Sequence, residues 1–218
     1  MIIHNLETSN SVLNHFVSEI RDVEIQKDPM RFRRNIERIG EILSYELSKA
    51  LHFTDHKTKT PLGEKTIPLI SDELVLCSVL RAGLPLHQGI LNYFDKIENA
   101  FISAYRHHTS PESFEIRAEY LASPSLENKI LILADPMLAT GSSLSTVYDI
   151  LKDLGNMREI HIVAVIAASE GVDHVAAHFP DNTHLWVATV DPELNAQGYI
   201  VPGLGDAGDL SYGIKLSH

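Results

Sequence analysis

The chain has 218 residues, of which 44% are hydrophobic and 22% are charged. This length predicts one domain spanning residues 1–218, and this composition excludes a wholly disordered chain, a collagen and a coiled coil. The formal net charge of -11 disfavours binding to nucleic acid or to an anionic membrane surface, so an anionic ligand must be held by local donors.

Cysteine usage and the N-terminal residues set two further limits. The single cysteine, Cys77, lies in an apolar run, where we expect a buried and unreactive thiol in preference to a catalytic one. Residues 1–7 lack the pattern of a secretory signal, and the longest mostly apolar run, residues 160–168, is too short to span a bilayer. We therefore expect a cytoplasmic protein.

The first predicted element is a helix over residues 31–51. Apolar side chains recur there at three- and four-residue spacing, beginning with Phe32 and Ile36, and charged residues occupy the opposite face. The polar stretch that follows, residues 54–65, contains a proline and a glycine and therefore predicts a loop or an exposed hairpin.

The second half of the chain alternates between apolar runs and helix-like segments. The runs predict strands at residues 74–79, 100–104, 130–134, 160–168 and 184–190. The segments between them predict helices at residues 84–93, 143–154 and 171–178. Because this alternation is typical of strands buried on both faces of a parallel sheet, the predicted fold class is α/β.

Ligands of open α/β sheets bind at the carboxyl ends of the strands, so the residues after each run are candidates for a site. These residues are Arg81-Ala82-Gly83, Tyr105-Arg106-His107, the segment 135–143, and Asp191-Pro192. Three of these four segments carry a charge suited to a phosphorylated ligand.

The segment 135–143 has the pattern of a phosphate loop. Asp135 ends a predicted strand, and Ala139-Thr140-Gly141-Ser142-Ser143 then opens a predicted helix. Small residues bring backbone N–H groups close to an anion, hydroxyls add donors, and the helix N-terminus adds partial positive charge. The segment is neither a Walker loop nor a three-glycine dinucleotide motif. For the Thr-Gly-Ser sequence alone, a serine that merely caps a helix is an equal alternative.

The longer string Asp-Pro-Met-Leu-Ala-Thr-Gly, which begins at Asp135, resembles the phosphoribosyl-pyrophosphate (PRPP) loop of the uracil phosphoribosyltransferase family. A second segment, Gly-Tyr-Ile-Val-Pro-Gly-Leu-Gly-Asp-Ala-Gly-Asp over residues 198–209, resembles the uracil-binding segment of the same family. Two motifs in the family's order are much more specific than either alone. The resemblance covers most of the chain from about Arg21 onward.

This resemblance implies an enzyme that converts uracil and PRPP to UMP and diphosphate. It implies a mainly parallel central sheet flanked by helices, an N-terminal helix and a flexible hairpin cover. Asp135, Arg106 and Asp206 would be the catalytic residues. The residues implied for PRPP are Arg81, Arg106, Asp135, Pro136, Met137, Leu138, Ala139, Thr140, Gly141, Ser142, Ser143 and Asp206, and those for uracil are Ile200, Gly205, Asp206 and Ala207.

The resemblance also implies a cofactor and partners. Mg²⁺ would bind mainly through the substrate diphosphate and water, without metal ligands from the protein. Homodimers and homotetramers occur in the family, some activated by GTP, and the sequence decides neither the assembly nor the effector.

The chain departs from the family at two places. Ser142 stands where a second glycine is usual, and serine disfavours a positive φ; we expect the loop to tolerate it. The predicted cover, residues 107–120, has an unusual pattern that begins with a histidine pair. This pair would titrate near neutral pH, although exposed histidines without a role are the simpler interpretation. The other ten histidines lack metal-ligand spacing.

Two other classes of function remain as alternatives at this stage. One is an RNA-binding regulator on the same fold, which needs a basic surface that the net charge disfavours. The other is an inactive relative that senses nucleotides, for which Ser142 and the altered residues 107–120 are the motivation.

Overall fold

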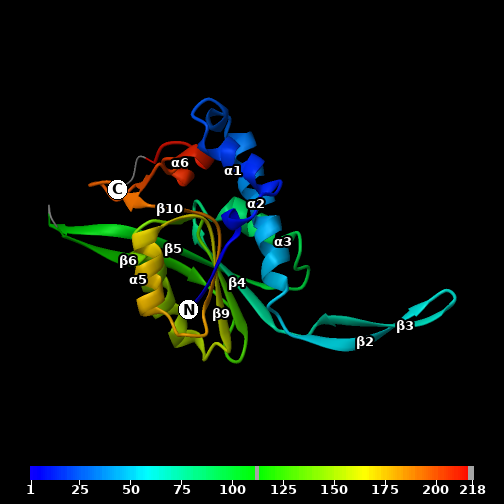
Figure 1. Ribbon diagram of the computed structural model, residues 1–218. Helices are drawn as coiled ribbons and strands as arrows, with labels where there is room; N and C mark the ends of the chain where they lie inside the picture. Colours follow the sequence, from blue (N-terminus) through cyan, green and yellow to red (C-terminus); the bar gives the residue numbers. More distant parts are fainter. Residues whose placement is uncertain (111–112, 216–218) are drawn as a thin grey trace.

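A mainly parallel sheet forms the centre of the molecule (Figure 1). Its strand order is β1-β10-β9-β7-β4-β5-β6, and every neighbouring pair is parallel except β5 and β6. The bounds are β1 Ile2–Asn5, β4 Leu74–Leu80, β5 Glu98–Ser110, β6 Ser113–Ala122, β7 Ile130–Ala134, β9 Glu159–Ala168 and β10 His184–Asp191. The short β8 (Met137–Leu138) also pairs with β9. The computed structural model describes residues 1–110 and 113–215, excluding the side chains of residues 104–119.

The apolar runs become strands because both faces of the sheet are covered. In β4, Leu74 and Leu76 belong to one core cluster, whereas Val75, Cys77 and Val79 belong to the other. Successive side chains point to opposite faces of a strand, so a strand buried on both sides is apolar throughout. Cys77 is fully buried, and burial raises the pKa of its thiol to about 12, as expected for an unreactive cysteine.

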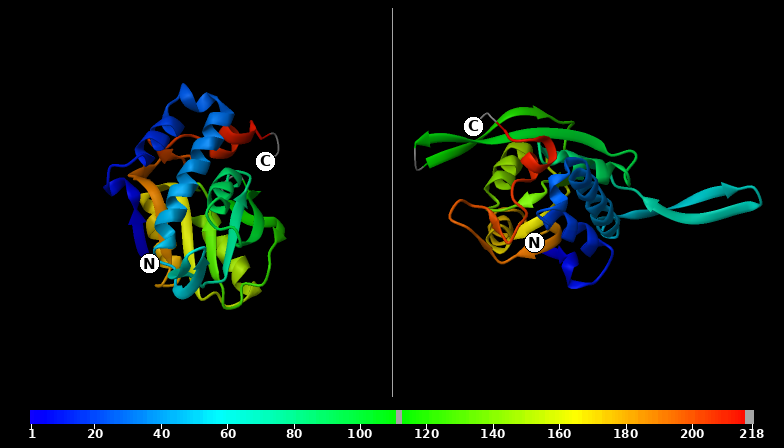
Figure 2. Two further views of the ribbon diagram at one scale, coloured as in Figure 1. Left: turned by 90° about the vertical axis from the view of Figure 1, so that its right-hand side faces the viewer. Right: turned by 90° about the horizontal axis from the view of Figure 1, so that it is seen from above.

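Helices cover the two faces of the sheet (Figure 2). One layer contains α1 (Leu13–Arg21), α2 (Pro29–Ser48) and α3 (Leu84–Leu91), and the other contains α4 (Ser142–Leu151) and α5 (Ser169–His178). The C-terminal α6 (Ala207–Tyr212) packs against α2. The short elements are η1 (Leu6–Thr8), η2 (Ile25–Lys27), η3 (Lys152–Leu154), β11 (Glu193–Leu194) and β12 (Ile200–Val201).

The structure confirms the α/β class and each predicted strand and helix, with shifted ends. The predicted helix 143–154 ends as a 3-10 turn, and the strand predicted at residues 100–104 extends over Glu98–Ser110. The sequence analysis missed β1 and α1. β1 is only four residues long and lies at the edge of the sheet, so it offers little periodicity to detect. No helix in the described ranges is long and apolar enough to cross a bilayer.

Two hairpins leave the body of the molecule on opposite sides (Figures 1 and 2). The polar stretch predicted as a loop or hairpin is the hairpin of β2 (Phe53–Thr60) and β3 (Gly63–Ile70), which form a separate two-stranded sheet. The predicted cover corresponds to the hairpin of β5 and β6. The histidine pair at residues 107 and 108 lies in this second hairpin, with side chains outside the described part.

Candidate active site

A pocket of about 280 Å³ lies at the carboxyl ends of the parallel strands, where the sequence analysis places the site. Two separate segments form most of its wall. The residues that line it are Ala82, Asp135, Met137, Leu138, Ala139, Thr140, Gly141, Ser143, Leu144, Gly198, Tyr199, Ile200, Gly205, Asp206, Ala207 and Gly208. The two motifs, which are far apart in the chain, therefore face one cavity.

The first wall is the loop between β7 and α4. Gly141 precedes α4 with a left-handed φ of +79°, and α4 begins at Ser142. Gly141, and not Ser142, takes the conformation that disfavours a side chain, so the serine fits as expected. The loop presents Thr140, Gly141 and Ser143 to the pocket at a helix N-terminus, which favours an anion.

Helix α5 supports this loop from behind through close backbone contact. A Cβ atom on Gly171 would lie 2.1 Å from the carbonyl oxygen of Ala139, so only glycine fits between the helix and the loop. A Cβ atom on Gly141 would meet the His174 side chain at 2.9 Å. The packing of α5 therefore fixes the backbone path of the first wall.

Asp135 lies directly after β7 and lines the pocket. Its backbone N–H donates to the carbonyl of Val163, and its Oδ1 accepts a long hydrogen bond of 3.3 Å from the Met137 N–H. Desolvation raises the pKa of this carboxyl to about 7, although the Met137 hydrogen bond opposes the shift. The carboxyl is therefore close to the midpoint of its titration at neutral pH.

The second wall is the C-terminal segment from Gly198 to α6. Gly198, Gly203 and Gly205 all have positive φ, which allows the tight path around β12. Asp206 caps α6 by accepting a 2.9 Å hydrogen bond from the Asp209 N–H. The residues predicted for uracil, Ile200, Gly205, Asp206 and Ala207, all line the pocket.

The two arginines predicted for the diphosphate differ in what the structure shows. Arg81 follows β4, and its Nη2 donates to Asp209 Oδ1 at 2.9 Å, so it joins this strand end to the second wall. It lies beside the pocket but is not among the residues that line it. Arg106 is on β5, where its side chain falls outside the described residues.

Pro136 and Ser142 also belong to the predicted PRPP set but do not line the pocket. Pro136 is buried behind the loop, where its carbonyl accepts backbone hydrogen bonds from Val165 and Ile166. The Ser142 N–H faces Thr140 Oγ1 at 3.4 Å. These two residues support the first wall from within.

Sequence analysis missed two arginines that contact the second wall: Arg21, and Arg33 of α2, which donates to the carbonyl of Ser211. Arg21, on α1, forms a two-pronged ion pair with Asp191 at distances of 2.7 and 2.8 Å, and it also donates to the carbonyl of Gly203. Asp191 is a strand-end residue, as expected, but it does not line the pocket. No local sequence pattern predicts the contacts of Arg21, because Asp191 and Gly203 are distant from it in the chain.

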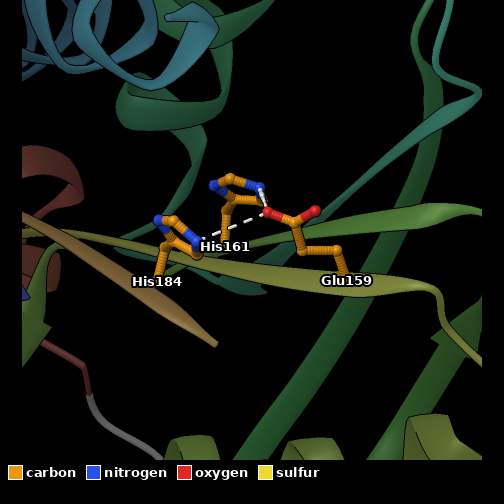
Figure 3. A group of neighbouring side chains, drawn as sticks. All are labelled: Glu159, His161 and His184. Carbon is orange, nitrogen blue, oxygen red and sulfur yellow. Dashed lines mark ion pairs between the residues drawn. The ribbon is translucent and has the colours of Figure 1, made fainter. Parts of the chain in front are cut away.

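A cluster of potential metal ligands lies at the opposite, amino-terminal ends of β9 and β10 (Figure 3). Glu159, His161 and His184 gather there, although their spacing in the sequence does not suggest a site. His161 Nδ1 accepts a hydrogen bond of 2.9 Å from the indole N–H of Trp186. Burial lowers the pKa of His161 to about 3, so the ring is neutral and carries its proton on Nε2, facing Glu159. A metal at Nε2 would move this proton to Nδ1, where the Trp186 N–H already donates, so we assign no metal to this cluster.

Comparisons with known proteins agree with the two motifs. A profile of the family described as uracil phosphoribosyltransferase matches residues 7–214. A uracil phosphoribosyltransferase of Porphyromonas gingivalis is 52% identical over 215 residues, which is 99% of each chain. One from Methanococcus vannielii is 41% identical over 193 residues, covering 87% of this chain and 82% of the relative.

Solved structures give the same result for the fold. The AQ2163 protein from Aquifex aeolicus superimposes with a TM-score of 0.87 and 30% identity, covering 99% of this chain and all of that one. A hypoxanthine phosphoribosyltransferase from Staphylococcus aureus has a TM-score of 0.51 and 18% identity, covering 85% of this chain and 83% of that one, which supports the fold alone. The family match and the full-length relatives show that the chain belongs to the uracil phosphoribosyltransferase family.

Proposed function

We propose that this protein transfers the phosphoribosyl group of PRPP to uracil, giving UMP and diphosphate. The observation that carries the proposal is the meeting of the two motifs in one pocket: the loop after β7 and the segment before α6 form facing walls. Each wall suits one of the two substrates. The full-length relatives named uracil phosphoribosyltransferase support the same reaction.

The first wall suits PRPP. The start of α4 with Ala139, Thr140, Gly141 and Ser143 would hold the 5-phosphate, since backbone N–H groups and hydroxyls converge there. Asp135 would accept hydrogen bonds from the ribose hydroxyls in its ionised form. The reaction passes through a cation-like sugar, and this carboxylate would stabilise the positive charge that develops on it.

Two arginines would bind the diphosphate that leaves. Arg81 follows β4, and Arg106 lies on β5, the strand that pairs with β4. A guanidinium keeps its charge and offers a fork of donors to phosphate oxygens. Arg81 is already oriented by its ion pair with Asp209, so it is held near the junction of the two walls.

The second wall suits uracil, which presents two carbonyl acceptors around one N–H donor. A backbone that offers N–H, C=O and N–H groups in that order reads this pattern without a charged side chain. Ile200, Gly205 and Ala207 would supply such contacts, and Asp206 would also reach the phosphoribosyl side. Cytosine has a donor in place of one carbonyl, so it would leave buried groups unpaired and be rejected.

The pocket fits a magnesium ion that is bound through its substrate. Among the described residues its lining includes two carboxylates, Asp135 and Asp206, which are too few for a site made of protein ligands alone. When bound to the diphosphate, Mg²⁺ would neutralise part of the charge on this leaving group. Asp135 and Asp206 would hold its water ligands and the nearby ribose oxygens in place.

The test is the formation of labelled UMP from labelled uracil by purified protein with PRPP and Mg²⁺. Turnover by the native protein, and its loss in Asp206→Ala, would support both the reaction and the second wall. Substrate binding without any turnover would overturn the proposal in favour of a nucleotide sensor. Neither that alternative nor an RNA-binding regulator gains support from the comparisons, and the net charge of -11 disfavours the latter.

We also propose a homo-oligomer assembled through the hairpin of β2 and β3. Its two strands pair only with each other in the described structure, and a solitary hairpin is marginally stable in water. The hairpin exposes apolar side chains, including Leu62, Ile67 and Leu69. Light scattering should show an oligomer for the native chain and a smaller species for the Leu62→Glu/Ile67→Glu variant. A monomeric native chain would contradict this proposal.

A further inference from the structure

Gly203 is held at both of its backbone groups by one partly buried ion pair. Its N–H donates to Asp191 Oδ2 at 2.9 Å, and its carbonyl accepts from Arg21 Nη1 at 3.0 Å. Arg21 and Asp191 are themselves joined through both carboxylate oxygens. The Asp191 side chain is 7% exposed and the Arg21 side chain is 21% exposed, so these bonds are largely shielded from water.

The position of Gly203 makes this arrangement relevant to the second wall. It lies between Ile200 and Gly205, both of which line the pocket. Its φ of +58° is left-handed, and a Cβ atom there would lie 2.1 Å from the carbonyl oxygen of Ile200. The backbone path is therefore tight at Gly203, and a shift there would move the groups on either side of it.

Both side chains of the ion pair come from regular elements in the body of the molecule. Asp191 is the last residue of β10 in the central sheet. Arg21 is the last residue of α1, which packs against α2 and buries Leu13 and Ile20 in the core. Arg21 and Asp191 thus hold the loop around Gly203, which has little regular structure of its own, in a fixed place relative to the sheet and α1.

Burying an ion pair costs solvation free energy, and a well-packed apolar pair often stabilises a fold equally well. An apolar pair could not hold Gly203 in the same way. The Asp191 carboxylate accepts from its N–H, and the Arg21 guanidinium donates to its carbonyl. We propose that Arg21 and Asp191 are positioning residues that set the backbone of the uracil-binding wall before the base arrives. This inference rests on the proposed function, and it names residues that touch neither substrate.

The test compares four variants of the full chain. Arg21→Ala removes the ion pair with Asp191 and the hydrogen bond to the Gly203 carbonyl. Arg21→Lys keeps the positive charge but not the two-pronged guanidinium. Asp191→Asn keeps an acceptor for the Gly203 N–H but not the negative charge. The matched control is Arg31→Ala, which removes the neighbouring two-pronged ion pair with Glu19 on the same helix. The measurements are KM for each substrate, kcat, and hydrogen exchange of the peptide spanning residues 199–205.

We expect Arg21→Ala to raise KM for uracil about 30-fold while KM for PRPP changes less than about threefold, because only one wall loses its support. Arg21→Lys and Asp191→Asn should be intermediate, and Arg31→Ala should leave both KM values near native. Exchange at residues 199–205 should accelerate at least about tenfold in Arg21→Ala and Asp191→Asn but not in the control.

Equal losses in Arg21→Ala and Arg31→Ala, or a loss of kcat with both KM values unchanged, would overturn the positioning role. If Arg21→Ala does not fold, the lysine and asparagine variants still decide the question. If the native protein makes no UMP, the proposed function fails, and the exchange measurement alone tests whether the ion pair orders this wall.

Discussion

The two walls of the pocket are held in place by different means. The wall that contains Asp135 is a direct continuation of β7 into α4, supported by the close approach of α5 to the loop. The wall that contains Asp206 has only the two-residue β12 and the short α6. It is fixed by arginines from distant parts of the chain: Arg21, Arg33 and Arg81.

Under the proposed function, one site combines a phosphate-binding wall built from neighbouring residues with a uracil-binding wall that distant side chains hold in place. A strand-loop-helix unit folds from neighbouring residues, so its geometry follows from the sheet. The second wall depends on side chains that reach it from α1, α2 and the end of β4, so each of them can change base binding without altering the phosphate loop. The following substitutions test that separation.

Asp206→Ala should have the largest effect, because it removes a carboxylate that lines the pocket and also the cap of α6. We expect kcat/KM to fall about 100-fold to 1,000-fold, as when a group that stabilises a transition state is removed. Asp206→Asn keeps a capping oxygen and separates the two roles. If the asparagine variant retains native kinetics, the carboxylate charge has no part in the reaction.

Arg81→Ala should lower kcat/KM for both substrates by about tenfold, because Arg81 joins the strand end after β4 to Asp209 of the second wall. The ion pair is partly exposed, so its contribution to folding should be small. Steady-state kinetics with each substrate varied in turn would measure the effect. A change confined to uracil would place Arg81 in the second wall alone.

Asp135 should make PRPP binding depend on pH. Its pKa is raised from 3.8 to about 7, so raising the pH through 7 should form the carboxylate and lower KM for PRPP. Asp135→Asn should have a KM about tenfold higher than the native value at pH 8. It should also show less pH dependence, with the ionisation of PRPP itself common to both proteins. The same pH slope in both would rule out Asp135 as the titrating group.

The raised pKa of Asp135 also affects stability, but here the protonated form, and therefore low pH, is favoured. Between about pH 4 and pH 7 the folded state holds a proton on Asp135 that the unfolded state has lost, so this group contributes a fall in stability as the pH rises through this window. The change should not exceed about 4 kcal/mol, since one pKa unit corresponds to about 1.4 kcal/mol. Urea unfolding of the native protein and Asp135→Asn at both ends of the window would measure it as the difference between their slopes, because His161, with a pKa lowered to about 3, adds a rise in stability with pH to both proteins.

Arg33→Ala should have the smallest effect. Arg33 Nη1 donates to the carbonyl of Ser211 at 2.6 Å and lies over the ring of Tyr212, so it fixes the end of α6 farthest from Asp206. We expect a loss of about 1 to 2 kcal/mol in stability and an increase in KM for uracil of about threefold. Thermal unfolding and uracil kinetics would measure both, and an equal change in KM for PRPP would argue against separate walls.

The first wall could be predicted closely from the sequence. The apolar run at residues 130–134 specifies a strand buried on both faces, and Asp135 through Ser143 contain the small residues of a turn into a helix. Gly141 takes the left-handed conformation, which leaves Ser142 in the helix as tolerated. These features depend on neighbouring residues, so local pattern was sufficient.

The second wall could be located but not explained from the sequence. Its glycines predict a tight path, yet the ion pair of Arg21 with Asp191 joins residues 170 positions apart. The helix α1 that carries Arg21 was missed as well. The sequence also did not predict the cluster of Glu159, His161 and His184, because the cluster depends on how β9 and β10 align in the sheet. Contacts between distant segments leave no periodic signal.

The most direct test of separate walls uses two glycine substitutions, Gly141→Ala and Gly205→Ala. Both glycines line the pocket and have positive φ, +79° and +95°, so an alanine strains the backbone of one wall at a time. At Gly141 the added Cβ also meets the His174 side chain at 2.9 Å, whereas at Gly205 no atom lies within 4 Å. Such strain is about 1 to 2 kcal/mol, which corresponds to about tenfold in affinity. We predict that Gly141→Ala raises KM for PRPP about tenfold and that Gly205→Ala does so for uracil, each leaving the other KM within about threefold. Equal effects of both substitutions on both substrates would contradict the account.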